Sequence, residues 1–261
     1  MAKHEIHHTL HTFDVELDKL NSLLLSVIDL LASQLQLSLQ GLEDQDLQSA
    51  EYAIKLMNEI EEHTIGIDVR VLAILARFTP VAYDLRSVVL ISKIASQLKI
   101  IANQNASFAR YVNSLFESSN TVSLTGSRQA GRYILSFLEK FRRLVDEHEI
   151  NEFSDFISLN QEYETMLSSK LREELIDLIQ TTHDDSQVRL AMAVVEFMEF
   201  CPNQFRRIMK DVISFWRLSD MDYRHQWVSE AAYYTAQKRG FFPGFDLHDW
   251  LQAEKEFFRQ H

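Results

Sequence analysis

The chain has 261 residues, of which 46% are apolar and 25% charged, and its formal net charge is −12. A chain of this size can bury a large core, and its acidic balance, without a long run of Lys and Arg, argues against direct nucleic-acid binding and against adhesion to anionic lipid. Because it contains only 6 glycines and 3 prolines, long uninterrupted helices are expected.

The single cysteine, Cys201, cannot form an internal disulfide, which is consistent with a reducing cytoplasm. The N-terminus lacks the apolar core of a signal peptide, and no apolar run approaches the roughly 20 residues of a membrane span. We therefore expect a soluble, cytoplasmic, almost all-α protein.

The first third of the chain predicts two long amphipathic helices. Apolar residues recur every three or four positions from about residue 10 to 42, and Gly41 is a suitable stop for this helix. An acidic turn at residues 43–46 separates it from a second helix of the same pattern, which ends before Thr79 and Pro80. Short connections of this kind join antiparallel neighbours.

A third helix is expected to begin at Thr79 and to complete a first three-helix bundle. Thr79 can cap a helix, Pro80 suits its first position because an N–H would be unpaired there, and Asp84 lies at the positive end of the helix dipole. The apolar stripe of this helix continues to about residue 116 and is interrupted only at Asn105.

The middle of the chain repeats this plan. A polar segment at residues 118–127 indicates a joint, and the pattern after it predicts three more helices, with a break near residues 181–185 before the last of them. The halves are related by about 100 residues, a period that fits tandem three-helix units. Pro202 is expected to kink the last helix. We therefore expect a first bundle at residues 1–120 and a second at residues 121–219.

Residues 220–261 have a different, aromatic-rich composition. Two short helices, at about 226–238 and 246–259, are predicted around a turn that contains Gly and Pro, so this segment forms a helical hairpin. A hairpin of this size cannot bury so many rings unaided, and it should dock onto the bundles, a second subunit or a partner. Trp227 and Trp250 are therefore candidates for partner contact, and a homodimer is expected.

The segment from Pro80 to Arg86, with the sequence Pro-Val-Ala-Tyr-Asp-Leu-Arg, resembles the Pro-x-x-x-Asp-Leu-Arg start of the third helix in the PhoU family of phosphate-transport regulators. The resemblance covers roughly residues 5–218 and implies two similar three-helix bundles side by side. Residues 220–261 are similar to a short bacterial two-helix domain of unknown function, which implies no activity. Asp84 and Arg86 either pair or cap within the protein or, as motif residues, face a partner.

PhoU proteins carry acids spaced four residues apart on the second and third helices of each bundle, and such pairs together bind hard metal ions. No pair here keeps both acids. Lys99 places a cation at one ligand position, where it repels metal and can neutralise neighbouring acids. No cofactor is therefore expected, although the residual acids leave divalent metal binding open. The matching pairs are Met57 and Glu61, Lys99 and Asn103, Asn160 and Glu164, and Glu199 and Asn203, so the residual acids are Glu61, Glu164 and Glu199.

Four histidines near the N-terminus, His4, His7, His8 and His11, are spaced so that they share one helix face, a geometry able to hold a divalent transition metal. Because chain termini are usually poorly ordered, the sequence favours exposed histidines over a metal site. The chain contains no Gly-rich phosphate loop, no Gly-x-Ser-x-Gly elbow and no Cys-His pairing, so no enzyme activity is predicted.

The sequence is compatible with three functions. The resemblance implies a non-enzymatic regulator or adaptor of phosphate uptake and phosphate-starvation signalling. Its partners would be the ATPase of a phosphate ABC transporter and a sensor histidine kinase, and it would be peripheral to the membrane only through them. One alternative is a divergent, metal-free paralogue that acts as a scaffold for another partner through its C-terminal hairpin. The other is a carboxylate-bridged metal-binding protein, which ranks last because tandem Glu-x-x-His pairs are missing.

Overall fold

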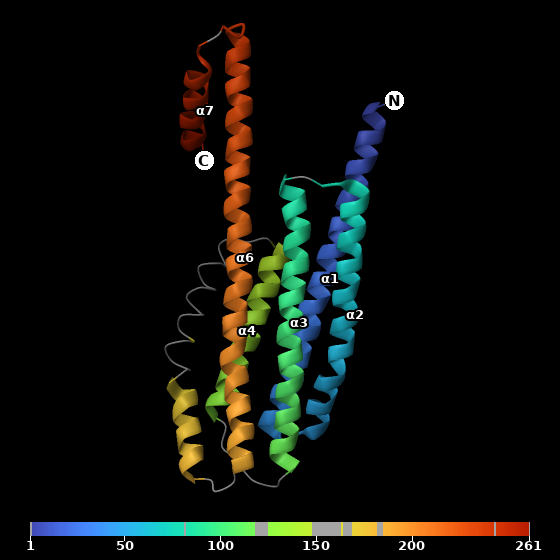
Figure 1. The fold of residues 1–261 in the computed structure, drawn as a ribbon, viewed down its shortest axis with the longest axis vertical. Helices are drawn as coiled ribbons and strands as arrows, with labels where there is room; N and C mark the ends of the chain where they lie inside the picture. Colours follow the sequence, from blue (N-terminus) through green and yellow to red (C-terminus); the bar gives the residue numbers. More distant parts are fainter. Residues whose placement is uncertain are drawn as a thin grey trace.

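The computed structural model describes residues 2–80, 82–117, 125–147, 163, 169–181, 185–242 and 244–260, and every regular element among them is helical. This confirms the predicted all-α class. Helices α2, α3 and α6 stand side by side along the long axis of the molecule (Figure 1). The helices are α1 (Ala2–Asp44), α2 (Leu47–Phe78), α3 (Ala82–Glu117), α4 (Thr125–Glu147), α6 (Asp185–Lys238) and α7 (Asp246–Gln260), and a further helical segment spans residues 169–181.

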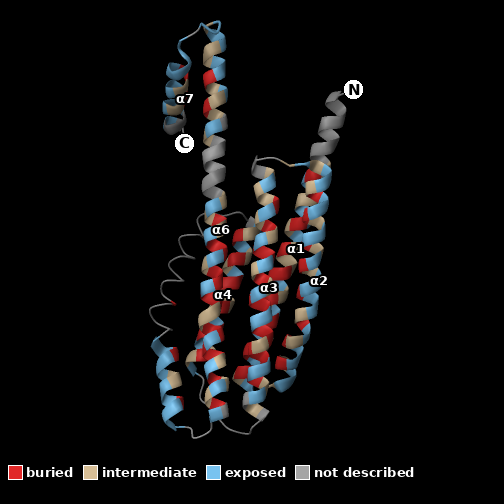
Figure 2. Ribbon diagram, in the orientation of Figure 1, coloured by how far each residue is buried: buried red, intermediate tan, exposed pale blue. Residues whose placement is uncertain are grey.

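The core is built from the apolar stripes seen in the sequence. Helix α1 packs against α2, α3 and α4, and α3 packs against α6, so the two bundles share one continuous core. Figure 2 shows the buried residues concentrated where these helices face one another. At the junction of the bundles, the ring of Phe108 in α3 stacks on Phe197 in α6 with centroids 4.7 Å apart. The predicted stripe of α1 is buried at Leu20, Leu24, Val27, Leu31 and Leu35.

Helix α1 is longer than predicted, because it runs through Gly41 and ends at Asp44. The expectation that Gly41 stops the helix is wrong. Gly41 instead lets α2 approach closely, since a Cβ at this position would lie 2.9 Å from the Cβ of Ala50. The chain turns at Gln45, which has a φ of 57°, and Asp46 then caps α2 by accepting hydrogen bonds from the backbone N–H groups of residues 48 and 49.

The corner between α2 and α3 also differs from the prediction. Thr79 does not cap α3; it ends α2 in the left-handed region, with a φ of 44°, and its N–H donates to the carbonyl of Leu75. Pro80 consequently lies between the helices, and α3 begins at Ala82. Asp84 does lie in the first turn of α3, as expected.

Helix α1 also bears on the expectation that no apolar run approaches the length of a membrane span. The stretch Thr12–Asp44, with a mean hydropathy of 1.5 over its most apolar 18-residue window, is long and apolar enough to cross a membrane by length and composition alone. Its apolar side chains pack against α2, α3 and α4, however, and a core helix passes the same test. Core packing therefore accounts for this composition.

In the second half, α4 begins at Thr125, so Gly126 and Ser127 are helical rather than part of the predicted joint, whose residues 118–124 lie outside the described residues. Helix α6 is continuous from Asp185 to Lys238 and passes through Pro202. The predicted helix at residues 226–238 is thus the far end of α6, and the expected boundary between residues 219 and 220 falls inside a helix. Helix α7 packs back on this far end and forms the predicted hairpin.

Candidate functional site

The exposed line along which α2 and α3 meet holds two polar contacts, and we call it the outer seam. Glu61 and Asp68 lie seven residues apart on α2, and Ser92 and Lys99 lie seven apart on α3, so each pair occupies one helix face. The Lys99 Nζ donates to Glu61 Oε1 over 2.7 Å, and the Ser92 hydroxyl donates to Asp68 Oδ1 over 3.1 Å. The seam therefore presents carboxylates that already have a hydrogen-bond donor.

The second bundle has a matching ion pair with the charges exchanged between the helices. In the first bundle the acid is on α2 and the base on α3, whereas in the second Arg172 of the 169–181 segment lies 3.9 Å from Glu199 of α6. Asn203, four residues after Glu199, donates its side-chain amide to the backbone carbonyl of Glu199 over 3.0 Å. Glu164 and Asn160 lie outside the described residues.

The geometry of these positions does not fit a metal cluster of the kind that the family resemblance implies. Such a cluster needs several convergent oxygen ligands without a cation among them. Lys99 and Arg172 place cations beside Glu61 and Glu199, and among the described residues no three His, Cys, Asp or Glu side chains gather as metal ligands. The side chains of His4, His7, His8 and His11 lie outside the described ones.

Apolar side chains flank the polar contacts of the outer seam at the end near the α2–α3 corner. Leu72 is 66% exposed, and the others are exposed to a lesser degree. The exposed residues of α2 form a second apolar stripe with a spacing of three and four residues. This spacing is visible in the sequence, but the sequence alone does not distinguish an exposed apolar stripe from one that packs in the core. The flanking residues are Ile65, Val69 and Leu72 on α2 and Leu85 and Val89 on α3.

The two motif residues at the start of α3 lie at the same end of the molecule. Asp84 and Arg86 are both half-buried. Burial, and to a smaller extent the nearby carboxylate of Asp14 in α1, raise the pKa of Asp84. Asp84 therefore belongs to the contact between α3 and α1, while its remaining exposure keeps it reachable from solvent.

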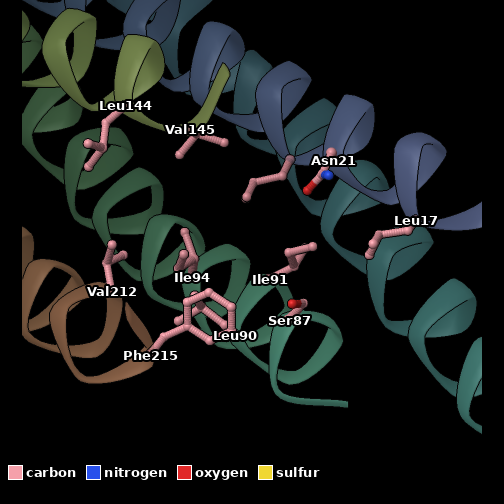
Figure 3. A pocket seen from close by; sticks show the side chains of 11 residues that line it. Leu17, Asn21, Ser87, Leu90, Ile91, Ile94, Leu144, Val145, Val212 and Phe215 are labelled. Carbon is pink, nitrogen blue, oxygen red and sulfur yellow. The ribbon is translucent and has the colours of Figure 1, made fainter. Parts of the chain in front are cut away.

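A cavity of about 140 Å³ opens next to this motif, between α1, α3, α4 and α6. Ser87, one residue after Arg86, is on its wall, and Asn21 is its other polar lining residue (Figure 3). It lies at the junction of the two bundles, where α6 leaves the core. The apolar lining consists of Leu17, Leu24, Leu90, Ile91, Ile94, Leu144, Val145, Val212 and Phe215.

The C-terminal hairpin has a small core of its own. Trp227 and Trp250 are half-buried and pack against Val228, Ala232 and Ala253, and the ring of Trp250 lies 5.0 Å from that of His225. Both tryptophans, predicted as partner contacts, thus also hold α7 to α6. The more exposed rings are elsewhere in the hairpin, at Tyr233, Tyr234, Phe241, Phe242 and Phe245.

Comparisons with known proteins agree with this architecture. Residues 24–112 match the PhoU domain, and residues 223–258 match a family described as protein of unknown function (DUF2934). The phosphate-specific transport system accessory protein PhoU of Escherichia coli K12 is 21% identical over 217 residues, which is 82% of this chain and 88% of that protein. Its homolog from Pseudomonas aeruginosa is 26% identical over 221 residues, covering 82% and 89%.

Two solved structures have the same fold. The phosphate transport system regulatory protein PhoU from Streptococcus pneumoniae superimposes with a TM-score of 0.68 at 21% identity, over 78% of this chain and 96% of that one. PhoU from Pseudomonas aeruginosa gives 0.71 at 23% identity, over 78% and 99%. These matches confirm the predicted resemblance and the PhoU-like tandem-bundle fold: the chain is a divergent relative of the PhoU proteins with an added C-terminal segment of unknown function.

Proposed function

We propose that this divergent PhoU relative is a non-enzymatic, cytoplasmic regulator or adaptor of phosphate uptake and phosphate-starvation signalling. The observation that carries the proposal is the match to phosphate-transport accessory proteins over 82% of the chain. The ATPase of a phosphate ABC transporter and a sensor histidine kinase are the proposed partners. In this proposal the two bundles, residues 1–120 and 121–219, form the regulatory body, and the protein acts as a homodimer.

The end of the molecule near the α2–α3 corner supports a partner contact. The half-buried Asp84 and Arg86, the cavity beside Ser87 and the apolar flank of the outer seam all lie near the start of α3. A surface that combines exposed apolar side chains with a few charged ones is typical of a protein-binding site. We therefore place the contact with the phosphate transporter there.

Deletion of the gene in its host tests the proposal. Loss of the protein should raise alkaline phosphatase expression under phosphate-replete conditions and alter phosphate uptake, and the wild-type gene should restore both. A gene with Asp84→Asn and Arg86→Gln should restore them incompletely, whereas the control Glu62→Gln, an exposed residue of α2, should restore them fully. A deletion strain with normal phosphatase expression and uptake would contradict the phosphate role.

A second candidate function, a scaffold for a different partner, is favoured by the hairpin. Among the described helices α7 contacts only α6, so its outer surface is not covered by the bundles. A pull-down from host lysate with the full chain and with a chain that lacks residues 220–261 separates the two functions. Capture of the transporter ATPase by both forms supports the phosphate role, and a partner captured only with the hairpin supports the scaffold.

A further inference from the structure

The turn that joins α6 to α7 is the most distant point of the molecule from the bundles. In Figure 1 the far part of α6 extends beyond the start of α3, and α7 folds back along it. Figure 2 shows this end mostly as exposed surface. We call the end of the hairpin, residues 233–251, the aromatic tip.

Large apolar side chains of the aromatic tip are exposed to an unusual degree. Phe241 is 53% exposed, Phe242 68% and Leu247 72%. Exposed apolar surface that gathers in one place marks an interaction site, whereas single exposed residues do not. The exposed set is Tyr233, Tyr234, Phe241, Phe242, Phe245, Leu247 and Leu251.

The backbone at the end of α6 sets the conformation of Phe241. At the end of α6, the Gly240 N–H donates to the carbonyl of Gln237 over 3.0 Å and the Phe241 N–H donates to the carbonyl of Ala236 over 2.8 Å. Phe241 itself has a φ of 56°, which is unfavourable for a bulky residue. Since half of its side chain stays exposed, burial within the chain does not fully compensate this cost. A strained, exposed phenylalanine indicates a functional role.

The apolar side chains do not form one flat face. Val228 and Ala232 of α6 are buried against α7, and Tyr234, about 200° around the helix from Ala232, points to the opposite side. On α7, Leu247 and Leu251 likewise lie about 200° from the buried Asp249 and face away from α6. Apolar groups thus cover both outer sides of the hairpin and its turn, as suits a knob that enters an apolar medium rather than a patch that meets a flat protein surface.

The charge of the aromatic tip differs from that of the whole chain. Although the net charge is −12, the tip holds two cations, Lys238 and Arg239, and two acids, Asp246 and Asp249. Arg239 forms an ion pair with Asp249, which is only 2% exposed, and its guanidinium lies 4.7 Å from the ring centre of Phe245. From Phe215, which lines the cavity, to Lys238, α6 rises about 35 Å, several times the Debye length of about 8 Å. The acidic bundles therefore repel a lipid surface only weakly when the tip meets it.

From these features we propose that the aromatic tip inserts its phenylalanine and leucine side chains into the interfacial region of a lipid bilayer. Aromatic rings are enriched at that depth, and the locally neutral tip carries no excess of acidic groups there. The expectation from the sequence, that acidic balance argues against adhesion to anionic lipid, applies to the bundles and not to this end of the hairpin.

Sedimentation of the full chain with large unilamellar vesicles tests the proposal, using phosphatidylcholine alone and phosphatidylcholine mixed with phosphatidylglycerol. The wild-type protein should bind both. The double variant Phe241→Ser and Phe242→Ser should reduce the lipid–water partition coefficient at least about tenfold, because two half-exposed rings lose their transfer into the bilayer. Phe242→Trp should retain binding, and brominated lipids should quench its added fluorescence.

A matched control removes similar apolar area elsewhere. Ile176→Ser with Ile179→Ser changes two residues that are 54% and 50% exposed on the 169–181 segment, and it should leave vesicle binding unchanged. Circular dichroism verifies that each variant keeps its helix content. The proposal is overturned if wild-type protein does not sediment with either vesicle, or if both double variants lower binding equally. Self-association that is lost in the Phe241→Ser and Phe242→Ser variant, without vesicle binding, overturns it in favour of a contact between copies.

Discussion

Lys99 of α3 donates to Glu61 of α2 over 2.7 Å, so an ammonium group occupies a position where the PhoU pattern has an acid. Lys99 is 30% and Glu61 50% exposed in their side chains. An ion pair this exposed contributes only about 0–1 kcal/mol to folding. Its larger consequence is electrostatic, because a positive charge at this point opposes the binding of a cation.

Replacing Lys99 and Asn103 by acids is therefore expected to create a metal site. With Lys99→Glu and Asn103→Asp, α3 presents two carboxylates beside Glu61, which gives a hard divalent ion three carboxylate side chains. We expect the double variant to retain about one equivalent of Mn²⁺ after dialysis, measured by inductively coupled plasma mass spectrometry. Lys99→Gln with Asn103→Gln is the control, which removes the cation without adding acids and should bind none.

Asn105 of α3 is fully buried, and neither atom of its side-chain amide has a hydrogen-bond partner within the described part of the chain. Burying an unpaired amide costs about 1–3 kcal/mol. Asn105→Leu is similar in volume and should raise the free energy of unfolding by about 1–2 kcal/mol, measured by guanidinium denaturation. The exposed Asn103→Leu should change it by less than about 0.5 kcal/mol. Destabilisation by Asn105→Leu would mean that a bound water or another group satisfies this amide.

Glu174 of the 169–181 segment caps α4 from outside the helix. It accepts hydrogen bonds from the backbone N–H of Gly126 over 3.2 Å and of Ser127 over 3.0 Å. Burial nevertheless raises the pKa of Glu174 above the ordinary 4.5, since desolvation exceeds the effect of these bonds. A raised pKa in the folded state means that this carboxyl stabilises the fold most below its unfolded pKa, and that the contribution falls as pH rises through the folded pKa.

Glu174→Gln keeps an acceptor oxygen and cannot ionise. Its unfolding free energy should therefore lack the part of the wild-type decline that sets in as pH rises above 4.5. Guanidinium denaturation at a series of pH values checks this, with the exposed neighbour Glu173→Gln as the control that follows the wild type. A Gln variant that loses stability in parallel with the wild type across this range would contradict the assignment to Glu174.

The apolar stripes of the bundles could be predicted from sequence because a spacing of three and four residues directly reflects burial on a helix face. The helix ends at the corners could not. The sequence predicts Thr79 at the start of α3 because threonine caps helices, but Thr79 closes α2 at positive φ, and local propensity cannot tell which neighbouring helix a cap serves. The prediction that Gly41 ends α1 failed for a related reason. The small size of Gly41 allows close packing against Ala50, a tertiary contact that sequence position does not reveal.

The candidate site was predictable only in part. Alignment to the PhoU pattern located Glu61 and Lys99, but their 2.7 Å contact depends on the register of α2 against α3. The ion pair of Arg172 with Glu199 was not anticipated, because Arg172 lies outside the acid positions of the pattern. The sequence shows a surplus of aromatic residues in the hairpin, but it points to the two tryptophans as contacts, and these are half-buried.

The ion pair between Arg239 and Asp249 is expected to hold α7 against α6. Asp249→Asn keeps the shape of the side chain and removes its charge, so α7 should detach more often. Its amide hydrogens should then exchange at least about tenfold faster, measured by mass spectrometry, while those of α1 stay unchanged.

The same ion pair should depend on pH. Hydrogen bonds from Arg239 lower the pKa of Asp249 below 3.8, so in the wild type the ion pair persists at neutral pH and is lost as pH falls through the pKa of Asp249 in the folded state. The near-ultraviolet circular dichroism of Trp227 and Trp250 should report this loss, and the Asn variant should not show the transition. Lys255→Gln, at an exposed position of α7, is the control and should behave as wild type. Equal exchange in Asp249→Asn and wild type would assign the closure of the hairpin to the tryptophan cluster instead.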